Sequence, residues 1–168
     1  MVMRISSQSF ALLLATLLLS ACGFHLRGQA GMPFNTLYLD TVNSKTPFIS
    51  ELRRSLEANK VKLAPTAAQA DVVLKVVFEN SDKQILTLSG SGRVTEFRLI
   101  YSVSLRAYDH KQQDWIPAEE MALRRDYSYD DTKVLAKEAE ETLLYQSMRS
   151  EMVQQIMRRL SHAKPQPQ

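Results

Sequence analysis

The chain has 168 residues, of which 45% are hydrophobic and 23% are charged, and its formal net charge is +3. This length fits one domain with a core of its own, and a single cysteine excludes a fold held together by disulfide bonds. The small positive charge permits an anionic partner without requiring one, and we expect no nucleic-acid partner.

The N-terminus has the organisation of a secretory signal that ends at a cysteine. Arg4 supplies a positive charge, residues 10–19 form a nearly uninterrupted apolar run, and two small residues precede Cys22. This is the order of a bacterial lipobox, so we expect removal of residues 1–21 and a covalent lipid, S-diacylglycerol and N-acyl, on Cys22. The alternative is a membrane-spanning helix with a buried cysteine, but the apolar run is shorter than the roughly 20 residues that a span needs.

The expected organisation has four segments. Residues 1–21 are the removed signal, 22–35 the lipid anchor and tether, 36–161 a single α/β sandwich domain, and 162–168 a flexible tail. Gly23 follows the cysteine where aspartate would retain a lipoprotein in the inner membrane of enteric bacteria. We therefore expect a lipid-anchored protein of the outer membrane.

The first elements of the domain are a strand, a helix and a second strand. Residues 36–40 alternate as a short strand, and Val72–Phe78 is rich in valine, as is typical of a strand. Between them, Thr46 and Pro47 suit the cap and the first position of a helix, and Asn59 suits its end in the left-handed region. Alternation predicts one strand face made of Val72, Leu74, Val76 and Phe78, and an opposite face made of Val73, Lys75, Val77 and Glu79.

Two long strands and a long helix follow. Val94–Tyr108 alternates with a period of two, a polar loop follows at 109–114, and Trp115–Tyr129 forms the next strand. Asp130–Thr132 should cap a helix that runs from about 133 to 160. Its predicted inner positions are Leu135, Ala139, Leu143, Val153, Ile156 and Leu160, and its predicted solvent side holds Glu138, Glu140, Glu141, Arg149 and Arg158.

The order β-α-β-β-β-α predicts an α+β fold, with two helices packed on one face of a four-stranded mixed sheet. The apolar rows of three strands then face the helices, and their polar rows form an uncovered face. A monomer can leave such a face in water. The alternative is that a partner covers it.

No pattern of catalytic residues is present. His25, His110 and His162 are scattered along the chain and lack metal-ligand spacing. Residues 90–92 lack the strand-to-helix setting of a nucleophilic serine and the lysine of a phosphate loop. Acylation would also remove Cys22 as a nucleophile. We expect a non-enzymatic protein without cofactor or metal, and a lipid-anchored hydrolase is the competing hypothesis.

Basic residues gather near the glycine-containing tip and the start of the last helix. Arg93 lies at the tip, Arg124 precedes the corner, and Lys133 and Lys137 share one helix face. If the two long strands pair as a hairpin, these cations come to the same end of the sheet. Such a cluster suits a phosphorylated sugar-lipid headgroup, because guanidinium and ammonium groups pair with phosphate. The alternative is that they are ordinary solvated side chains.

Three stretches carry a resemblance to a known family. Cys22–Gly28 (CGFHLRG) resembles the start of the mature LPS-assembly lipoproteins of the LptE family. Gly92–Leu99 resembles the family's Gly-x-x-x-Glu-Tyr strand start, and Val134–Lys137 resembles its Ala-Leu-Ala-Lys helix start. The length and the order of elements also match through the last helix.

The resemblance implies a function and a lipopolysaccharide (LPS) site. Members of the family plug the lumen of LptD, the β-barrel of the outer-membrane LPS translocon, and they bind LPS and assist its assembly into the outer leaflet. Lys137 matches the family's LPS-contacting lysine. The family's second LPS-contacting residue is an arginine in the hairpin tip; that position falls at 89–91 here, with Arg93 slightly downstream. We therefore expect Arg93, Lys137, Arg124 and Lys133 to bind LPS.

The resemblance also implies contacts with the barrel. Tyr127 and Tyr129 fall where the family has aromatic residues against the barrel wall, and we add Arg98 to these expected contacts. The implied location is the periplasmic side of the outer membrane and the barrel lumen, whose polar lining suits a sheet with a polar face. The alternative is a structural or barrel-assembly lipoprotein without a lipid site.

Overall fold

The computed structural model describes residues 31–166, so the expected signal and Cys22 lie outside the described residues. The strands are β1 (Thr36–Thr41), β2 (Lys62–Leu63), β3 (Val72–Leu88), β4 (Val94–Tyr108) and β5 (Asp114–Ser128). The helices are α2 (Pro47–Ala58) and α3 (Val134–His162), with short 3₁₀ turns η1 (Ala67–Gln69) and η2 (Asp131–Lys133).

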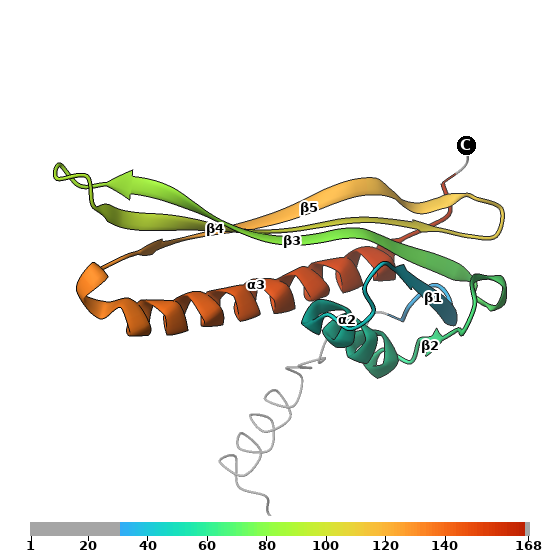
Figure 1. Cartoon of the computed structure of the whole chain (residues 1–168). Helices are drawn as coiled ribbons and strands as arrows, with labels where there is room; N and C mark the ends of the chain where they lie inside the picture. Colours follow the sequence, from blue (N-terminus) through green and yellow to red (C-terminus); the bar gives the residue numbers. More distant parts are fainter. Residues whose placement is uncertain (1–30, 167–168) are drawn as a thin grey trace, which may run out of the picture. The chain divides into compact units, whose positions relative to one another are not determined.

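The strands form one mixed sheet in the order β2-β1-β3-β4-β5. β1 is parallel to β2 and to β3, and β3, β4 and β5 are antiparallel neighbours. Both helices lie on the same side of the sheet (Figure 1). The α+β class and the two helices are confirmed, but the prediction of four strands is wrong. The fifth strand, β2, has two residues and is too short to leave a periodic signal.

The first helix begins as its sequence predicts. Thr46 is the N-cap and its Oγ1 accepts a hydrogen bond from the N–H of Ile49 at 3.2 Å, and Pro47 takes the first position. Its end differs by one residue, because Asn59 has a φ of −89° and the left-handed conformation belongs to Lys60, with a φ of 65°. The buried side of this helix is made of Phe48, Ile49, Leu52 and Leu56.

β4 has the predicted bounds and forms the centre of the core. Leu99, Val103, Leu105 and Ala107 are at most 1% exposed, and their row faces the helices. The polar residues of β4 alternate with this row and lie on the uncovered face of the sheet, as a period of two requires. The predicted two-sided strand is therefore confirmed.

β3 is longer than predicted and contains a β-bulge at Val77. The register shifts between Val76, which is opposite Leu105, and Phe78, which is opposite Ser104. A bulge adds one residue, so the side chains beyond it change face. Phe78 is consequently 46% exposed, and Glu79 turns towards the helices. The predicted faces of these two residues are wrong for this reason.

α3 contributes to the core only in its C-terminal half. Its buried residues are Met148, Met152, Val153, Ile156, Met157 and Leu160. Leu135 and Leu143 are 83% and 64% exposed, and Ala139 is exposed as well, so these three predicted inner positions are wrong. Arg149, predicted to face solvent, is half-buried and donates to Glu51 of α2 at 3.3 Å.

Packing extends beyond residues 36–161 on both sides. Phe34 is buried and its ring meets Trp115 edge-on at 5.8 Å. Ala163 is buried, and the N–H of Gln166 donates to the carbonyl of Asp114 at 2.8 Å. Within residues 31–166, no helix has both the length and the apolar character needed to cross a bilayer.

Candidate functional site: the corner of the β3–β4 tip and α3

The tip between β3 and β4 is fixed by its own hydrogen bonds. The N–H of Ser89 donates to the carbonyl of Arg93 at 2.7 Å, and the N–H of Gly92 donates to the carbonyl of Ser89 at 2.9 Å. Gly92 has a φ of 80°, a conformation that glycine adopts without strain. The turn therefore holds Arg93 in a defined place at the end of the sheet.

The end of β5 is tied to the same region. The N–H of Tyr129 donates to the carbonyl of Thr95 at 2.8 Å, and Asp130 then caps η2. The Oδ1 of Asp130 accepts hydrogen bonds from the N–H and the hydroxyl of Thr132, at 3.0 and 2.7 Å. These bonds, with smaller contributions from the charges of Lys133 and Lys137, hold the pKa of Asp130 below its usual value. Asp130 is therefore a fixed negative charge at the start of the last helix.

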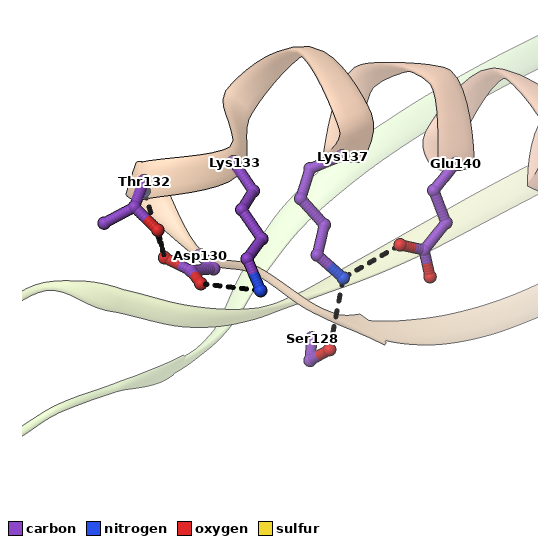
Figure 2. Close-up of polar contacts among 6 residues, drawn as sticks. All are labelled: Ser128, Asp130, Thr132, Lys133, Lys137 and Glu140. Carbon is purple, nitrogen blue, oxygen red and sulfur yellow. Dashed lines mark hydrogen bonds and ion pairs between the residues drawn. The ribbon is translucent and has the colours of Figure 1, made fainter.

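Three of the four cations expected to bind LPS meet at this corner. Figure 2 shows Lys133 and Lys137 pointing from the start of α3 towards Asp130 and Ser128. Lys133 Nζ is 3.9 Å from Asp130 Oδ2, and Lys137 Nζ donates to Ser128 Oγ at 3.3 Å and to Glu140 Oε2 at 2.8 Å. The predicted convergence is correct for these two lysines.

Arg93 joins the corner from the tip, and Arg124 does not. Arg93 Nη1 is 3.6 Å from Asp131 Oδ2 of η2. Arg124 is opposite Ile100 and lies on the face of the sheet away from α3. We name the group Arg93, Lys133 and Lys137, with Asp130 and Asp131, the tip corner.

Carboxylates are the part of the tip corner that the sequence did not indicate. Each of its three cations has an acidic partner, so the positive charge expected there is largely offset within the chain. Asp130 and Asp131 were assigned only to capping the helix. The spacing of three between Asp130 and Lys133 could have suggested their pair, because residues three apart on a helix are neighbours, whereas Asp131 pairs with Arg93 from a distant segment.

A surface pocket of about 290 Å³ opens at this corner. It offers an aromatic ring, a guanidinium group, hydroxyl groups and two carboxylates, from Ser89, Ser91, Arg93, Val94, Thr95, Tyr129, Asp130 and Asp131. Hydroxyls and carboxylates bond to sugar hydroxyls, and the guanidinium group bonds to phosphate. The pocket is chemically suited to a charged sugar headgroup.

Tyr127 lies inside the domain. It is 6% exposed, its ring stacks on Phe97 at 5.9 Å, and its hydroxyl donates to Glu141 Oε2 at 2.7 Å. Burial, and then Glu141, raise the pKa of Tyr127 far above its usual value. A direct contact of Tyr127 with a barrel wall is not available in this arrangement. Tyr129, half-buried and edge-on to Phe97 at 5.0 Å, reaches the surface pocket.

Glu141 connects α3 to the sheet. It was expected to face solvent, but its Oε2 accepts hydrogen bonds from Lys83 Nζ at 2.8 Å and from Tyr127 at 2.7 Å. The ammonium group of Lys83 also lies 4.8 Å from the centre of the Phe97 ring. Together these groups hold the N-terminal half of α3 by polar contacts.

Arg98 lies on the uncovered face and is already paired. Its Nε and Nη2 donate to the two carboxylate oxygens of Asp126, both at 2.8 Å. The pair raises the pKa of Arg98 and lowers that of Asp126. This part of the uncovered face thus carries a paired arginine.

Comparisons with known proteins agree with this structure. The family described as LptE, lipopolysaccharide-assembly, matches residues 34–160. A protein named LPS-assembly lipoprotein LptE from Pectobacterium atrosepticum is 27% identical over 155 residues, covering 88% of this chain and 80% of its own length. One of the same name from Yersinia pestis is 28% identical over 150 residues, covering 88% of this chain and 72% of its own length.

Solved structures support the same relationship. The solution structure of an uncharacterized lipoprotein B from Nitrosomonas europaea has a TM-score of 0.71 and 35% identity, covering 83% of this chain and 90% of its own. Rare lipoprotein B from Shewanella oneidensis has a TM-score of 0.67 and 27% identity, covering 74% of this chain and 92% of its own. The family match spans most of the described fold, including the tip and most of the last helix. The chain belongs to the LptE family of lipopolysaccharide-assembly lipoproteins.

Proposed function

We propose that this chain is a non-enzymatic outer-membrane lipoprotein that plugs the LptD barrel, binds LPS and assists its assembly into the outer leaflet. Family membership supports the role in LPS assembly. The observation that carries the LPS site is the meeting of Arg93, Lys133 and Lys137 beside a pocket lined by hydroxyls and an aromatic ring. The acyl groups on Cys22 would anchor the protein on the periplasmic side of the membrane.

The acidic partners allow an exchange when the headgroup binds. The pairs of Arg93 and Lys133 are long, at 3.6 and 3.9 Å, and both cations are more than two-thirds exposed. Exposed pairs of this kind contribute only about 0–1 kcal/mol. A phosphate group that forms charge-assisted hydrogen bonds with the same cations can therefore replace the carboxylates at a small cost in free energy. Lys137 is 16% exposed and held by Ser128, so it is already oriented.

The uncovered face of the sheet is the proposed contact with the barrel. It carries Arg98 paired with Asp126, and Arg106 paired with Asp114 at 2.6 Å. Paired charges and hydroxyls suit the polar lumen of a large outer-membrane barrel. We keep Arg98 as a proposed contact and assign Arg124 to the same face. Tyr129 stays a proposed barrel contact at the end of the sheet, beside the tip corner, and Tyr127 supports α3 from within.

The LPS site is tested by titrating the full chain with LPS and following the binding by intrinsic fluorescence or calorimetry. The double change Arg93→Asp and Lys137→Asp should weaken binding by more than tenfold, because each substitution replaces a cation by a repelling charge. The matched control changes two exposed cations elsewhere, Arg54→Asp and Lys111→Asp, with the same change in net charge. Equal affinity in both double variants would rule out the assigned site.

The offset charge at the tip corner favours a second candidate, a structural or barrel-assembly lipoprotein without a lipid site. In that case the pairs of Arg93, Lys133 and Lys137 with carboxylates only fix the corner. The same titration separates the two functions. This second candidate predicts no saturable LPS binding by the unmodified chain, together with an intact complex with the barrel.

A further inference from the structure

The tether joins the domain at a fixed point. The Oδ2 of Asp71 accepts hydrogen bonds from the N–H groups of Asn35 and Thr36, at 3.0 and 2.9 Å, and the N–H of Asp71 donates to Thr36 Oγ1 at 2.8 Å. Just before them, Phe34 is buried and its ring lies against Trp115. The tether therefore enters the domain beside Trp115, near the start of β5.

Other segments meet at the same end of the sheet. The strand pairings place the starts of β1, β2 and β3 beside the β4–β5 hairpin (Figure 1). The N–H of Lys62 donates to the carbonyl of Asn35 at 2.9 Å, and the N–H of Gln166, just beyond α3, donates to the carbonyl of Asp114 at 2.8 Å. The tip corner lies at the opposite end of the sheet. We name residues 31–37, 60–72, 106–119 and 158–166 the anchor end.

The membrane that holds Cys22 lies within reach of the anchor end. From Cys22 to Phe34 the chain has 12 residue steps, which span at most about 42 Å when fully extended. An acylated Cys22 therefore keeps the anchor end close to the leaflet that holds its acyl chains. A linked pair of sites meets at a high effective concentration, so the headgroups of this leaflet are favoured partners for the anchor end.

The anchor end is basic, whereas the rest of the domain is acidic. It contains seven lysine and arginine residues against four aspartate and glutamate residues, and the other described residues contain twelve against fourteen. A surface of one sign at one end of a molecule attracts and orients partners of the opposite sign. The end at which the tether enters is therefore the end that favours an anionic surface.

Most cations of the anchor end have no acidic partner. Ion pairs occupy Arg106, with Asp114, and Arg159, with Glu119. At the tip corner, by contrast, each cation already has a carboxylate, so an anion from outside meets less competition at the anchor end. Five exposed cations of the anchor end form no ion pair within residues 31–166: Lys60, Lys62, Lys111, Arg158 and Lys164.

A surface pocket of about 380 Å³ lies at the last turns of α3. It is lined by Gln155, Arg158, Arg159 and His162, with no carboxylate among these four. The carbonyl of Arg158 already accepts a hydrogen bond from the Ser161 hydroxyl at 2.9 Å, and His162 Nδ1 lies 2.8 Å from the same oxygen. Guanidinium groups form charge-assisted hydrogen bonds with phosphate, so the pocket is chemically suited to a phosphate group.

We propose that the anchor end lies on the anionic phospholipid headgroups of the leaflet that holds the acyl chains of Cys22, with Arg158 bound to a headgroup phosphate. The inference depends on the proposed acylation of Cys22 and not on LPS binding. The acyl chains supply the hydrophobic attachment, and the cations beside them add attraction to anionic lipids. The contact orients the domain, with the tip corner directed away from that leaflet.

The test uses the full acylated chain in vesicles of phosphatidylcholine alone or with one third phosphatidylglycerol. Trp115 is the only tryptophan of the chain, so energy transfer from it to a dansyl-labelled headgroup lipid reports how closely the anchor end approaches the membrane. We expect transfer to be about twofold more efficient in the anionic vesicles, and high salt should remove the difference because it screens exposed charges. Mass spectrometry of Cys22 comes first. A missing acyl group would contradict both proposals, whereas an intact one leaves the headgroup contact as the only variable.

Two double variants complete the experiment. Arg158→Glu with Lys164→Glu should remove the gain in the anionic vesicles, because it reverses two cations of the anchor end. Lys45→Glu with Arg124→Glu makes the same change of charge at two exposed cations outside the anchor end that also form no ion pair within the described residues, and it should leave the gain unchanged. The proposal is overturned if transfer is equal in the two kinds of vesicle, or if the two double variants behave alike. A gain given by vesicles that contain LPS but not by phosphatidylglycerol would assign the pocket to LPS and also overturn it.

Discussion

At the scale of single residues, the carboxylates of the tip corner set how strongly its cations can bind another anion. Asp131 holds Arg93 at 3.6 Å, and Asp130 holds Lys133 at 3.9 Å. Both are surface pairs that a phosphate group can displace. The affinity of the proposed headgroup site therefore depends on how much more strongly the same cations bind phosphate than they bind the carboxylates.

This competition gives a prediction for Asp131→Asn. The change frees Arg93 and should strengthen LPS binding about twofold to fivefold, the range that corresponds to an exposed pair. The measurement is the LPS titration of the full chain. Asp126→Asn frees Arg98 on the other face and is the matched control, which should leave the affinity unchanged. Weaker binding in Asp131→Asn would show that Asp131 contacts the ligand itself.

Tyr127 supports α3 through one hydroxyl group. Tyr127→Phe removes the hydrogen bond to Glu141 and should lower the free energy of unfolding by about 1 kcal/mol. Tyr129→Phe is the comparison, because its edge-on ring contact with Phe97 is kept without the hydroxyl. Both are measured by denaturant unfolding. A loss of LptD association in Tyr127→Phe at unchanged stability would instead place this tyrosine at the barrel wall.

Alkaline pH should weaken the fold. Burial raises the pKa of Tyr145 to about 12, and burial also raises those of Tyr127 and Tyr101. The unfolded chain loses these protons near pH 10, whereas the folded chain keeps them. The contribution of these tyrosines to the free energy of unfolding should therefore be constant below about pH 10 and fall between about pH 10 and 12. Tyr145→Phe should reduce the slope, and an equal slope in this variant would contradict the assignment.

At the scale of elements, α3 consists of two halves that are held differently. From Met148 onwards it packs apolar side chains into the core. The N-terminal half is attached by polar groups, chiefly Glu141 to Lys83 and Tyr127, and Tyr145 to the carbonyl of Asp82. Segments with few buried apolar contacts open locally at low free energy. The half that carries Lys137, and that directly follows Lys133 of η2, is therefore the half more easily released.

Glu141→Gln tests this division. The change weakens the attachment to Lys83, so amide exchange in residues 134–145 should rise several-fold while exchange from Met148 onwards stays the same. Glu138→Gln makes the same change of charge one turn away on the exposed side, and it should have no effect. Uniform acceleration along the whole helix in Glu141→Gln would mean that α3 opens as a single unit.

The elements also show where sequence reasoning succeeded and where it did not. The bounds of β4 follow from fifteen residues that alternate almost throughout, and the start of α2 follows from Thr46 and Pro47. The bulge at Val77 leaves no comparable mark, because one inserted residue changes the face of every later side chain while the composition stays strand-like. Leu135 and Leu143 have helical spacing, but α3 is longer than the core it covers, and periodicity alone does not give the length of the surface available for packing.

At the scale of the whole molecule, the sequence led to the family, and the family match covers residues 34–160. The sequence also predicted that Arg93, Lys133 and Lys137 lie at one end of the sheet. The second strand of an antiparallel hairpin returns to the end at which the first strand began. The sequence also predicted that Arg124 belongs to this group. Side chains alternate between the two faces along β5, and Arg124 therefore lies on the opposite face of the sheet. Opposing carboxylates were missed because pairs such as Arg93 with Asp131 join segments far apart in sequence.

We propose that this domain is anchored by a lipid on Cys22 and works inside LptD. The direct measurement is purification of the full chain from outer membranes in a mild detergent, with mass spectrometry of the lipid on Cys22 and of every protein that accompanies it. We predict an acylated Cys22 and a stable complex with the LptD barrel. Isolation of the acylated chain as a free species, with no barrel protein at any stage of purification, would contradict the account.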